Sequence, residues 1–268
     1  MKRMTLLMEI DDLHIKLACR EELKTEKISR YFEIIASGGV IVDGQINDKD
    51  RFQQILKGYL LKHKVKVKQV RIILKSEKIL LKYDTILNVL EKELENAIHN
   101  NIEKYFPMDI SDYTVDYKRI SESRILVVAL PEKIICDYIS VLSALRLVLV
   151  KVDIFQNCVA KVFAKMSGNI LLLYKNENKL DYIYLTNGLL HHSKEIKISE
   201  HENIAEILSR LDNQRRLHLK LDKVFILSEN MESVSEYFCY NNIPCELYSE
   251  ASNSISEKIL SKDRKSVV

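Results

Sequence analysis

Apolar and polar residues follow two different spacings along the chain, and each spacing predicts one kind of element. Alternating or continuous apolar segments predict strands over 4–10, 14–20, 30–37, 67–75, 113–120, 124–130, 146–153, 169–174, 180–186, 189–198, 223–228 and 244–248. Apolar residues three or four positions apart predict helices over 47–64, 84–106, 131–145, 154–165, 202–217 and 232–242. This mixture of strand–helix alternation and meanders indicates α/β or α+β layers in two lobes.

Two local signals mark the ends of predicted elements. Asp84 or Thr85 can cap the helix predicted over 84–106. Asn187-Gly188 lies between two predicted strands, and this dipeptide is the strongest short signal for a β-hairpin. The sequence therefore predicts a helix start and a hairpin turn at these positions.

Composition is that of an ordinary globular protein and excludes several classes. The 268 residues are 47% apolar and 29% charged, and the net charge of +3 is too small to indicate nucleic acid or lipid by itself. The five cysteines are scattered without a C-x-x-C pair, which favours reduced thiols over disulfides or a zinc site. The N-terminus lacks the pattern of a signal peptide, and the most apolar stretch, 139–152, is interrupted by Arg146 and Lys151. We therefore expect a cytoplasmic protein.

Glycine is scarce, which limits the kinds of ligand loop that the chain can build. There are six glycines where average usage predicts about nineteen. Loops that bring backbone amides against phosphate depend on glycine for positive φ and close approach. P-loop, G-x-G-x-x-G, G-x-S-x-G and H-E-x-x-H motifs are absent from the sequence. The scarcity argues against several phosphate-binding loops.

Two clusters have residue types that bind metals. Asp109, Asp112 and Asp116 lie in a segment that alternates like a strand, so the three carboxylates are not expected to converge. His191 and His192 are neighbours on a predicted strand and point to opposite faces. We interpret both clusters as structural or solvated residues, and the sequence predicts no metal site.

A basic run covers Leu61–Lys75 and contains no acidic residue. Such a run could bind nucleic acid, anionic lipid or an acidic peptide. Lysines also serve on exposed sheet edges to block strand pairing. The sequence favours this edge role, and nucleic acid is disfavoured because no stacking aromatic residues interleave the lysines.

Four collinear segments resemble the PilM family of type IV pilus assembly, which is related to the division protein FtsA. The segment 38–60 resembles that family's "dG.I.D" turn and following helix, and 89–120 resembles its helix ending in "E..yiPf....v.ldy". The segment 125–162 resembles its "vAa.ke" helix and "agL.p..vD" strand, and 187–196 resembles "nG.l.fsReI". Each motif is weak alone, but their order and spacing together identify the resemblance.

The resemblance implies an α/β fold of the actin-like (ribonuclease H-like) type, with two lobes. It predicts a first lobe over 1–160 with a small inserted subdomain at about 67–120, a second lobe over 161–250 and a flexible tail over 251–268. The stretch from Ile196 to Val224 is far shorter than in the family. We therefore expect the second lobe to be shortened, with its small subdomain missing or reduced.

The resemblance also implies partners and location. PilM-like proteins hold the cytoplasmic N-terminal tail of PilN, an inner-membrane protein, in a groove formed by the inserted subdomain and its neighbour. The assembly motor ATPase is a second implied partner, and self-association is left open. We expect a cytoplasmic scaffold at the inner face of the cell membrane, reaching the membrane only through its partner, with no nucleic-acid partner.

The chain departs from the family at the implied nucleotide site. The family's first phosphate turn reads D-x-G with a lysine five residues after the glycine. Aligning on Lys16 places Glu9 at the aspartate and Asp11 at the glycine, and the second D-x-G turn falls on Tyr174 and Asn176. A carboxylate at Asp11 places negative charge where phosphate oxygens need backbone amides. The departures predict a protein that is not an enzyme, has no catalytic residue and needs no cofactor.

Three alternatives stay open at the level of sequence. The chain could be a PilM-like protein that still binds ATP and Mg²⁺ in an altered cleft. It could be a regulatory or sugar-kinase-like module of the same superfamily. A nucleic-acid protein that uses the basic run Leu61–Lys75 is the third alternative.

Overall fold

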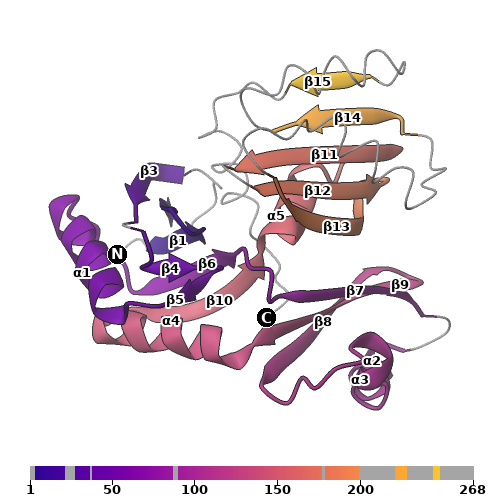
Figure 1. Cartoon of the computed structure of the whole chain (residues 1–268), viewed down its shortest axis with the longest axis horizontal. Helices are drawn as coiled ribbons and strands as arrows, with labels where there is room; N and C mark the ends of the chain where they lie inside the picture. The colour runs from indigo at the N-terminus through magenta and orange to yellow at the C-terminus, as the bar shows by residue number, and fades with distance from the viewer. Residues whose placement is uncertain are drawn as a thin grey trace. The chain divides into compact units, whose positions relative to one another are not determined.

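The computed structural model describes residues 4–21, 28–36, 38–86, 90–176, 179–198, 221–227 and 244–247. Contacts between residues divide the chain into two compact units, the first ending at Cys158 and the second beginning at Val159. Figure 1 shows the elements of both units. Among the described residues, no helix is long and apolar enough to cross a bilayer.

A five-stranded sheet forms the centre of the first unit. Its strands, in the order β10-β6-β1-β2-β3, are Val148–Ile154, Gln69–Leu74, Met4–Ile10, His14–Glu21 and Ile28–Ile35. β1, β6 and β10 run parallel, whereas β1, β2 and β3 form an antiparallel meander. These strands confirm the predictions from apolar spacing.

The position of β6 corrects one interpretation of the sequence. β6 pairs with β1 on one side and with β10 on the other, so it is an interior strand. The lysines that precede it belong to the end of a helix and to a loop. The prediction that the basic run blocks an exposed sheet edge is therefore wrong.

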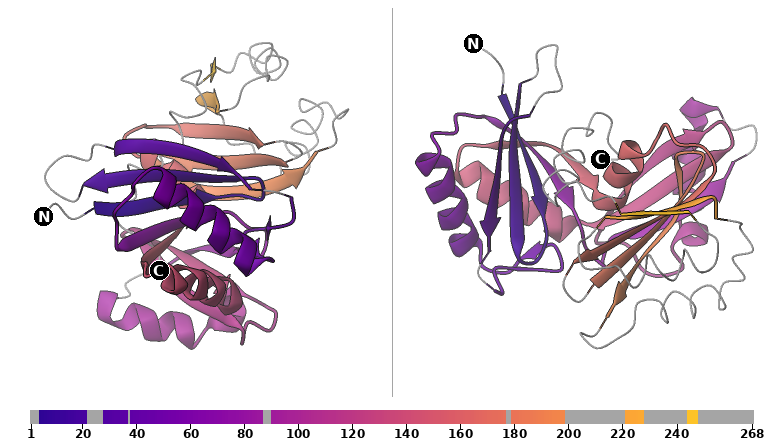
Figure 2. Two further views of the ribbon diagram at one scale, coloured as in Figure 1. Left: turned by 90° about the vertical axis from the view of Figure 1, so that its left-hand side faces the viewer. Right: turned by 90° about the horizontal axis from the view of Figure 1, so that it is seen from above.

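Two helices cover one face of this sheet (Figure 2). These are α1 (Lys49–Lys62) and α4 (Glu132–Ala144), whose apolar side chains share one core with the strands. The side chain of Asp48 caps α1 by accepting a hydrogen bond from the Arg51 amide at 2.8 Å. The side chains of Phe52 and Tyr138 meet edge to face in this core.

Both covering helices end in the same hydrogen-bonding motif. After α1, the amides of Lys64 and Val65 donate to Leu61 and Leu60, and Lys64 has φ of +51°. After α4, Arg146 takes the corresponding position with φ of +59°. Two backward bonds of this kind define a Schellman motif, in which glycine is usual at the left-handed residue. Each helix is therefore followed by a basic residue at a position that glycine would occupy with less strain.

A tight hairpin places one glycine against the sheet. β4 (Ile41–Val42) and β5 (Gln45–Ile46) are joined by Asp43 and Gly44, which have φ of +50° and +71°. Two consecutive positive φ values are typical of a type I′ turn. The carbonyl of Gly44 accepts a hydrogen bond from the buried Tyr138 hydroxyl at 3.0 Å, and burial raises the pKa of that hydroxyl far above its ordinary value.

A smaller sheet and two short helices are built from the segment between β6 and α4. Its strand order is β7-β9-β8, with bounds Leu80–Thr85, Arg124–Pro131 and Tyr113–Ser121. The helices are α2 (Glu91–His99) and α3 (Ile102–Tyr105). They pack on β8 and β9 through a separate apolar core, which includes Leu94 and Val127.

The prediction of one continuous helix over 84–106 is wrong in two respects: the helix begins later, and it is interrupted. Asp84 and Thr85 do not cap a helix; they end β7, where they pair with residues of β9. The helical part begins at Glu91 and is interrupted after His99. Pairing with the buried strand β9 outweighed the local capping signal, as tertiary contacts often do.

The second unit contains another five-stranded sheet. Its strands, in the order β13-β12-β11-β14-β15, are Leu189–Lys197, Lys179–Thr186, Asn169–Asn176, Lys223–Ile226 and Cys245–Leu247. α5 (Phe155–Val162) follows β10 and crosses the division between the units. Asn187 and Gly188 have φ of +51° and +73°, which confirms the predicted hairpin. The helices predicted over 202–217 and 232–242 lie outside the described residues.

Candidate functional site

The carboxyl ends of the three parallel strands form the first candidate site. Ligands of open α/β sheets bind at this end of the strands. The strand register places Lys16, Glu9, Ile73 and Asp153 in one row across β2, β1, β6 and β10. Because Leu6, Met8 and Ile10 face the helices, strand alternation places this row on the opposite face of the sheet.

Glu9 and Lys16 form a buried ion pair within this row. The Lys16 ammonium lies 3.4 Å from a Glu9 carboxylate oxygen, and the two side chains are 8% and 7% exposed. Two of the predicted nucleotide-site residues therefore contact each other. Their charges are at least partly compensated inside the protein.

Asp11 stabilises the turn between β1 and β2. One of its carboxylate oxygens accepts the backbone amides of Leu13 at 2.9 Å and His14 at 2.6 Å. The Asp11 amide in turn donates to the His14 carbonyl. An aspartate at the first position of a turn commonly makes these bonds. The carboxylate thus engages two amides of the turn that aligns with the family's first phosphate turn.

Asp153 and Asn157 connect this end of the sheet to neighbouring elements. Asp153 accepts the Ile154 amide at 2.9 Å and the Asn157 side-chain amide at 2.6 Å. The Asn157 carbonyl oxygen accepts from the Lys118 ammonium at 3.1 Å, which joins α5 to β8 of the small sheet. Both Asp153 and Asn157 are buried, and no motif in the sequence marks either residue.

The remaining predicted nucleotide-site residues lie in the second unit. Tyr174 is a half-buried residue of β11, where it pairs with Asp181 of β12. Asn176 is the last residue of β11 and pairs with Lys179. Glu9, Asp11 and Lys16 are together on one hairpin of the first unit, and the roles given to all five residues stay predictions.

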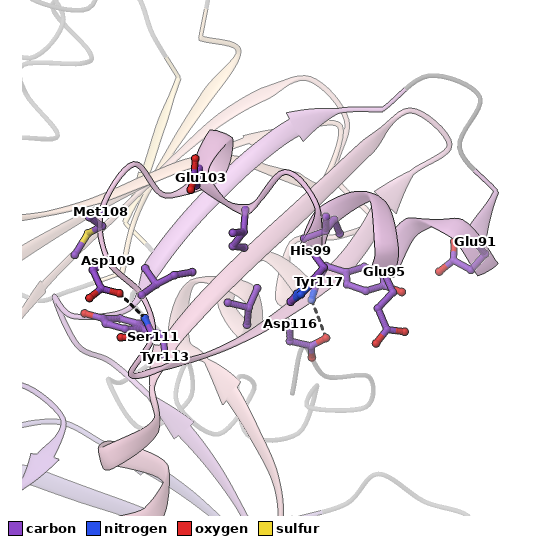
Figure 3. A pocket seen from close by; sticks show the side chains of 14 residues that line it. Glu91, Glu95, His99, Glu103, Met108, Asp109, Ser111, Tyr113, Asp116 and Tyr117 are labelled. Carbon is purple, nitrogen blue, oxygen red and sulfur yellow. Dashed lines mark hydrogen bonds between the residues drawn. The ribbon is translucent and has the colours of Figure 1, made fainter.

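The second candidate site is a groove on the small sheet, between α2, α3, the loop before β8 and β8 itself (Figure 3). Its volume is about 980 Å³. It is lined by Glu91, Glu95, Ile98, His99, Ile102, Glu103, Met108, Asp109, Ile110, Ser111, Tyr113, Val115, Asp116 and Tyr117. We call it the α2–β8 groove.

The α2–β8 groove combines an apolar lining with acidic side chains. Among the described residues that line it, five are acidic and none is lysine or arginine. Glu91 pairs with Arg119, whose Nε lies 2.6 Å from its carboxylate. Figure 3 shows Glu95 and Asp116 towards one end of the groove and Glu103 and Asp109 towards the other.

The acidic side chains change the proton affinities of the groove. Burial raises the pKa of Asp116, and the negative charge of Glu95 raises it further against the hydrogen bond from the Tyr117 amide. Partial burial and the same Glu95 charge raise the pKa of Tyr117. The bond from the Ser111 amide lowers the pKa of Asp109. The Glu95 part of the Asp116 pKa shift, unlike the larger part that comes from burial, indicates that a positive charge is favoured near Asp116.

The lining of the groove includes two of the three aspartates that were considered as metal ligands from the sequence. Asp109 and Asp116 both line it, whereas Asp112 is not among its lining residues. Glu91, Glu95 and Glu103 were missed, because a single helix from Asp84 gave no reason to place them opposite β8. Within the part of the chain that the structure describes, no three His, Cys, Asp or Glu side chains group as metal ligands.

Comparisons with known proteins agree with the observed architecture. A family model described as type IV pilus assembly protein PilM matches residues 8–177. Of the solved structures, a PilM-PilN type IV pilus biogenesis complex matches with a TM-score of 0.73 at 13% identity, covering 98% of this chain and 96% of that chain. The curated proteins give no match.

Two further structures share the fold. The cytoplasmic domain of EpsL, an inner membrane component of the type II secretion system of Vibrio cholerae, has a TM-score of 0.61 at 10% identity, covering 98% of this chain and 97% of that chain. A Bacteroides thetaiotaomicron protein with an actin-like ATPase fold and unknown function has a TM-score of 0.60 at 11% identity, with coverages of 97% and 96%. These matches confirm the predicted actin-like α/β fold.

Proposed function

Because the chain belongs to the PilM family of type IV pilus assembly proteins, we propose that it is a scaffold that binds the cytoplasmic N-terminal tail of a PilN-like inner-membrane protein. The observation that carries the proposal is the α2–β8 groove, an open channel with apolar and acidic lining in the first unit. The structural likeness to a PilM-PilN complex supports the choice of partner.

The charge of the groove matches the chemistry of such a tail. Cytoplasmic segments next to a membrane span carry an excess of lysine and arginine. A basic tail brings positive charge to Glu95 and Asp116, where neighbouring carboxylates already favour it. The apolar side chains of Met108 and Val115 in the same lining can contact aliphatic residues of the tail. Complementary charge of this kind contributes specificity and a fast association rate.

Removing two charges from the groove is expected to weaken tail binding about tenfold or more, equivalent to ~1.4 kcal/mol. The variant Glu95→Gln/Asp116→Asn keeps the size of both side chains. Binding of a synthetic peptide of the PilN-like tail is measured by calorimetry with the full chain. The control variant Asp112→Asn/Glu132→Gln removes the same charge from residues outside the groove lining and is expected to bind as the unmodified chain does.

The pH dependence provides a second check on the same binding. Asp116 has a raised pKa and takes up its proton at a higher pH than a free aspartate. As the pH is lowered, protonation of Asp116 removes a negative charge from the groove. Tail affinity in the unmodified chain should therefore begin to decrease at a higher pH than in an Asp116→Asn variant. Equal affinities of the groove variant, the control variant and the unmodified chain would contradict a role for the groove. An absence of binding in the unmodified chain would contradict the proposed partner.

We further propose that the protein does not bind or hydrolyse ATP. The carboxylate of Asp11 already accepts hydrogen bonds from two backbone amides of the β1–β2 turn. A phosphate bound there would have to compete with this carboxylate for the same amides. The ammonium of Lys16 is held by Glu9 across the hairpin. A phosphate would therefore be repelled by Asp11. It would also lack the contact that the resemblance implies for the lysine at this position, because Lys16 contacts Glu9 instead.

Calorimetric titration with ATP and Mg²⁺ is expected to give no saturable heat up to millimolar nucleotide. The Asp11→Gly variant serves as a comparison, because it removes the carboxylate from the turn. A micromolar, Mg²⁺-dependent dissociation constant for the unmodified chain would contradict the proposal and support the alternative that an altered cleft still binds ATP.

A further inference from the structure

A row of four lysines lies on the surface between α1 and β6. Lys62, Lys64, Lys66 and Lys68 are all exposed. Val65 and Val67 alternate with them and pack against the core of the first unit. This alternation fixes the segment on the protein and directs the lysines outward, so the row is an ordered surface.

The end of α4 adds to the same surface. α1 leads into β6 and α4 leads into β10, and these two strands are parallel neighbours, so both helices end at the same end of the sheet. The Val148 amide donates to the Lys68 carbonyl at 2.8 Å, which joins the two segments. Arg146 is exposed just before this bond. The cationic surface therefore comprises the four lysines and Arg146.

Exposed apolar side chains accompany these charges. Leu61 is 69% exposed at the end of α1, and Val148 is 59% exposed at the start of β10. The sequence from Arg51 to Ser76 contains no acidic residue that could neutralise the row locally. Cationic side chains around exposed aliphatic ones suit an interface that is anionic at its surface and apolar beneath.

Structural roles account for only part of the surface. A sheet-edge role does not apply, because β6 is an interior strand. A favourable interaction with the helix C-terminus explains Lys62 but does not extend to Lys66 and Lys68, which follow the helix. At Lys64 the positive φ makes lysine more strained than glycine.

We propose that this surface binds the anionic headgroups of phospholipids and contacts the membrane directly. The inference goes beyond the proposed attachment through a PilN-like partner and does not depend on it. Nucleic acid fits the surface less well, because the nearby rings of Phe32, Tyr59 and His63 already pack against one another, with Tyr59 stacked on His63 and Phe32 edge-on to Tyr59. Bases of single strands are held by rings that are available for stacking.

Vesicle co-sedimentation of the full chain without any partner tests the proposal. We expect binding to vesicles that contain phosphatidylglycerol and no binding to pure phosphatidylcholine. The variant Lys62→Gln/Lys64→Gln/Lys66→Gln/Lys68→Gln is expected to lose at least about fiftyfold in affinity, since each lysine near an anionic surface contributes roughly fivefold. The control variant Lys82→Gln/Lys92→Gln/Lys165→Gln/Lys194→Gln changes the net charge equally and should retain most binding.

The single variant Lys64→Gly separates lipid binding from folding. Glycine relieves the positive φ, so the midpoint of thermal unfolding should rise while vesicle affinity falls about fivefold. Equal binding to neutral vesicles, an equal loss in the control variant or no vesicle binding would each overturn the proposal. Tight binding of a DNA duplex with a steep salt dependence and no vesicle binding would instead assign the surface to nucleic acid.

Discussion

Replacing Lys16 with methionine is expected to lower the free energy of unfolding by about 3 to 5 kcal/mol. The substitution leaves the Glu9 carboxylate buried opposite an apolar side chain, near the turn end of the hairpin β1–β2. Removing one member of a buried ion pair is costly because the remaining charge keeps its desolvation penalty and loses its partner. Urea unfolding followed by circular dichroism measures the change.

A double variant determines whether the loss comes from the Glu9 charge that no longer faces Lys16. Glu9→Gln/Lys16→Met removes both charges, and we expect it to recover most of the stability lost in Lys16→Met. If Lys16→Met proved as stable as the unmodified chain, the Glu9–Lys16 contact would have no structural role. The case against nucleotide binding, which uses this contact, would then weaken.

Replacing Gly44 with alanine is expected to destabilise the protein by about 2 to 4 kcal/mol. An added Cβ would lie 2.7 Å from the Lys75 carbonyl oxygen, and Gly44 has φ of +71°. The clash is with backbone, so it cannot be relieved by a side-chain rotation. The hydrogen bond from the buried Tyr138 hydroxyl to the Gly44 carbonyl depends on the same turn geometry.

Gly58→Ala is the matched control for this substitution. Gly58 lies within α1, and an added Cβ there meets no atom within 4 Å. Alanine is the better helix former, so the control should gain about 0.5 to 1 kcal/mol. Opposite signs for the two glycine variants in the same unfolding assay are expected, and a neutral Gly44→Ala would contradict the close approach to the Lys75 carbonyl.

The strands of this protein could be predicted well from the sequence because each has a clear apolar pattern. β9 is apolar and buried from Ile125 to Leu130 and proved to be the central strand of its sheet, as expected for a strand buried on both faces. β7 was missed because Asp84 and Thr85 resemble a helix cap, whereas pairing with β9 determines their conformation. Local signals fail where a neighbouring strand offers stronger contacts.

The candidate sites were predictable to different degrees. The alignment to the family's D-x-G turn placed Glu9 and Lys16 in a common site, and they are cross-strand neighbours on one hairpin. The role of Asp11 as a turn-stabilising residue depends on hydrogen bonds that no alignment reports. The residues that line the α2–β8 groove could not be predicted, because Glu95 and Asp116 come together only when α2 packs across β8.

The connection between β6 and β10 has a consequence for how the protein is made. β6 pairs with β1, which precedes it in the chain, and with β10, which follows much later. β6 ends at Leu74, whereas β10 begins at Val148, after the whole small sheet and α4. A nascent chain emerging from the ribosome therefore presents β6 as an open, apolar strand edge until β10 is synthesised. The small sheet can assemble meanwhile from contiguous sequence. Its early folding would shorten the effective distance between β6 and β10 and limit the time during which that edge can aggregate.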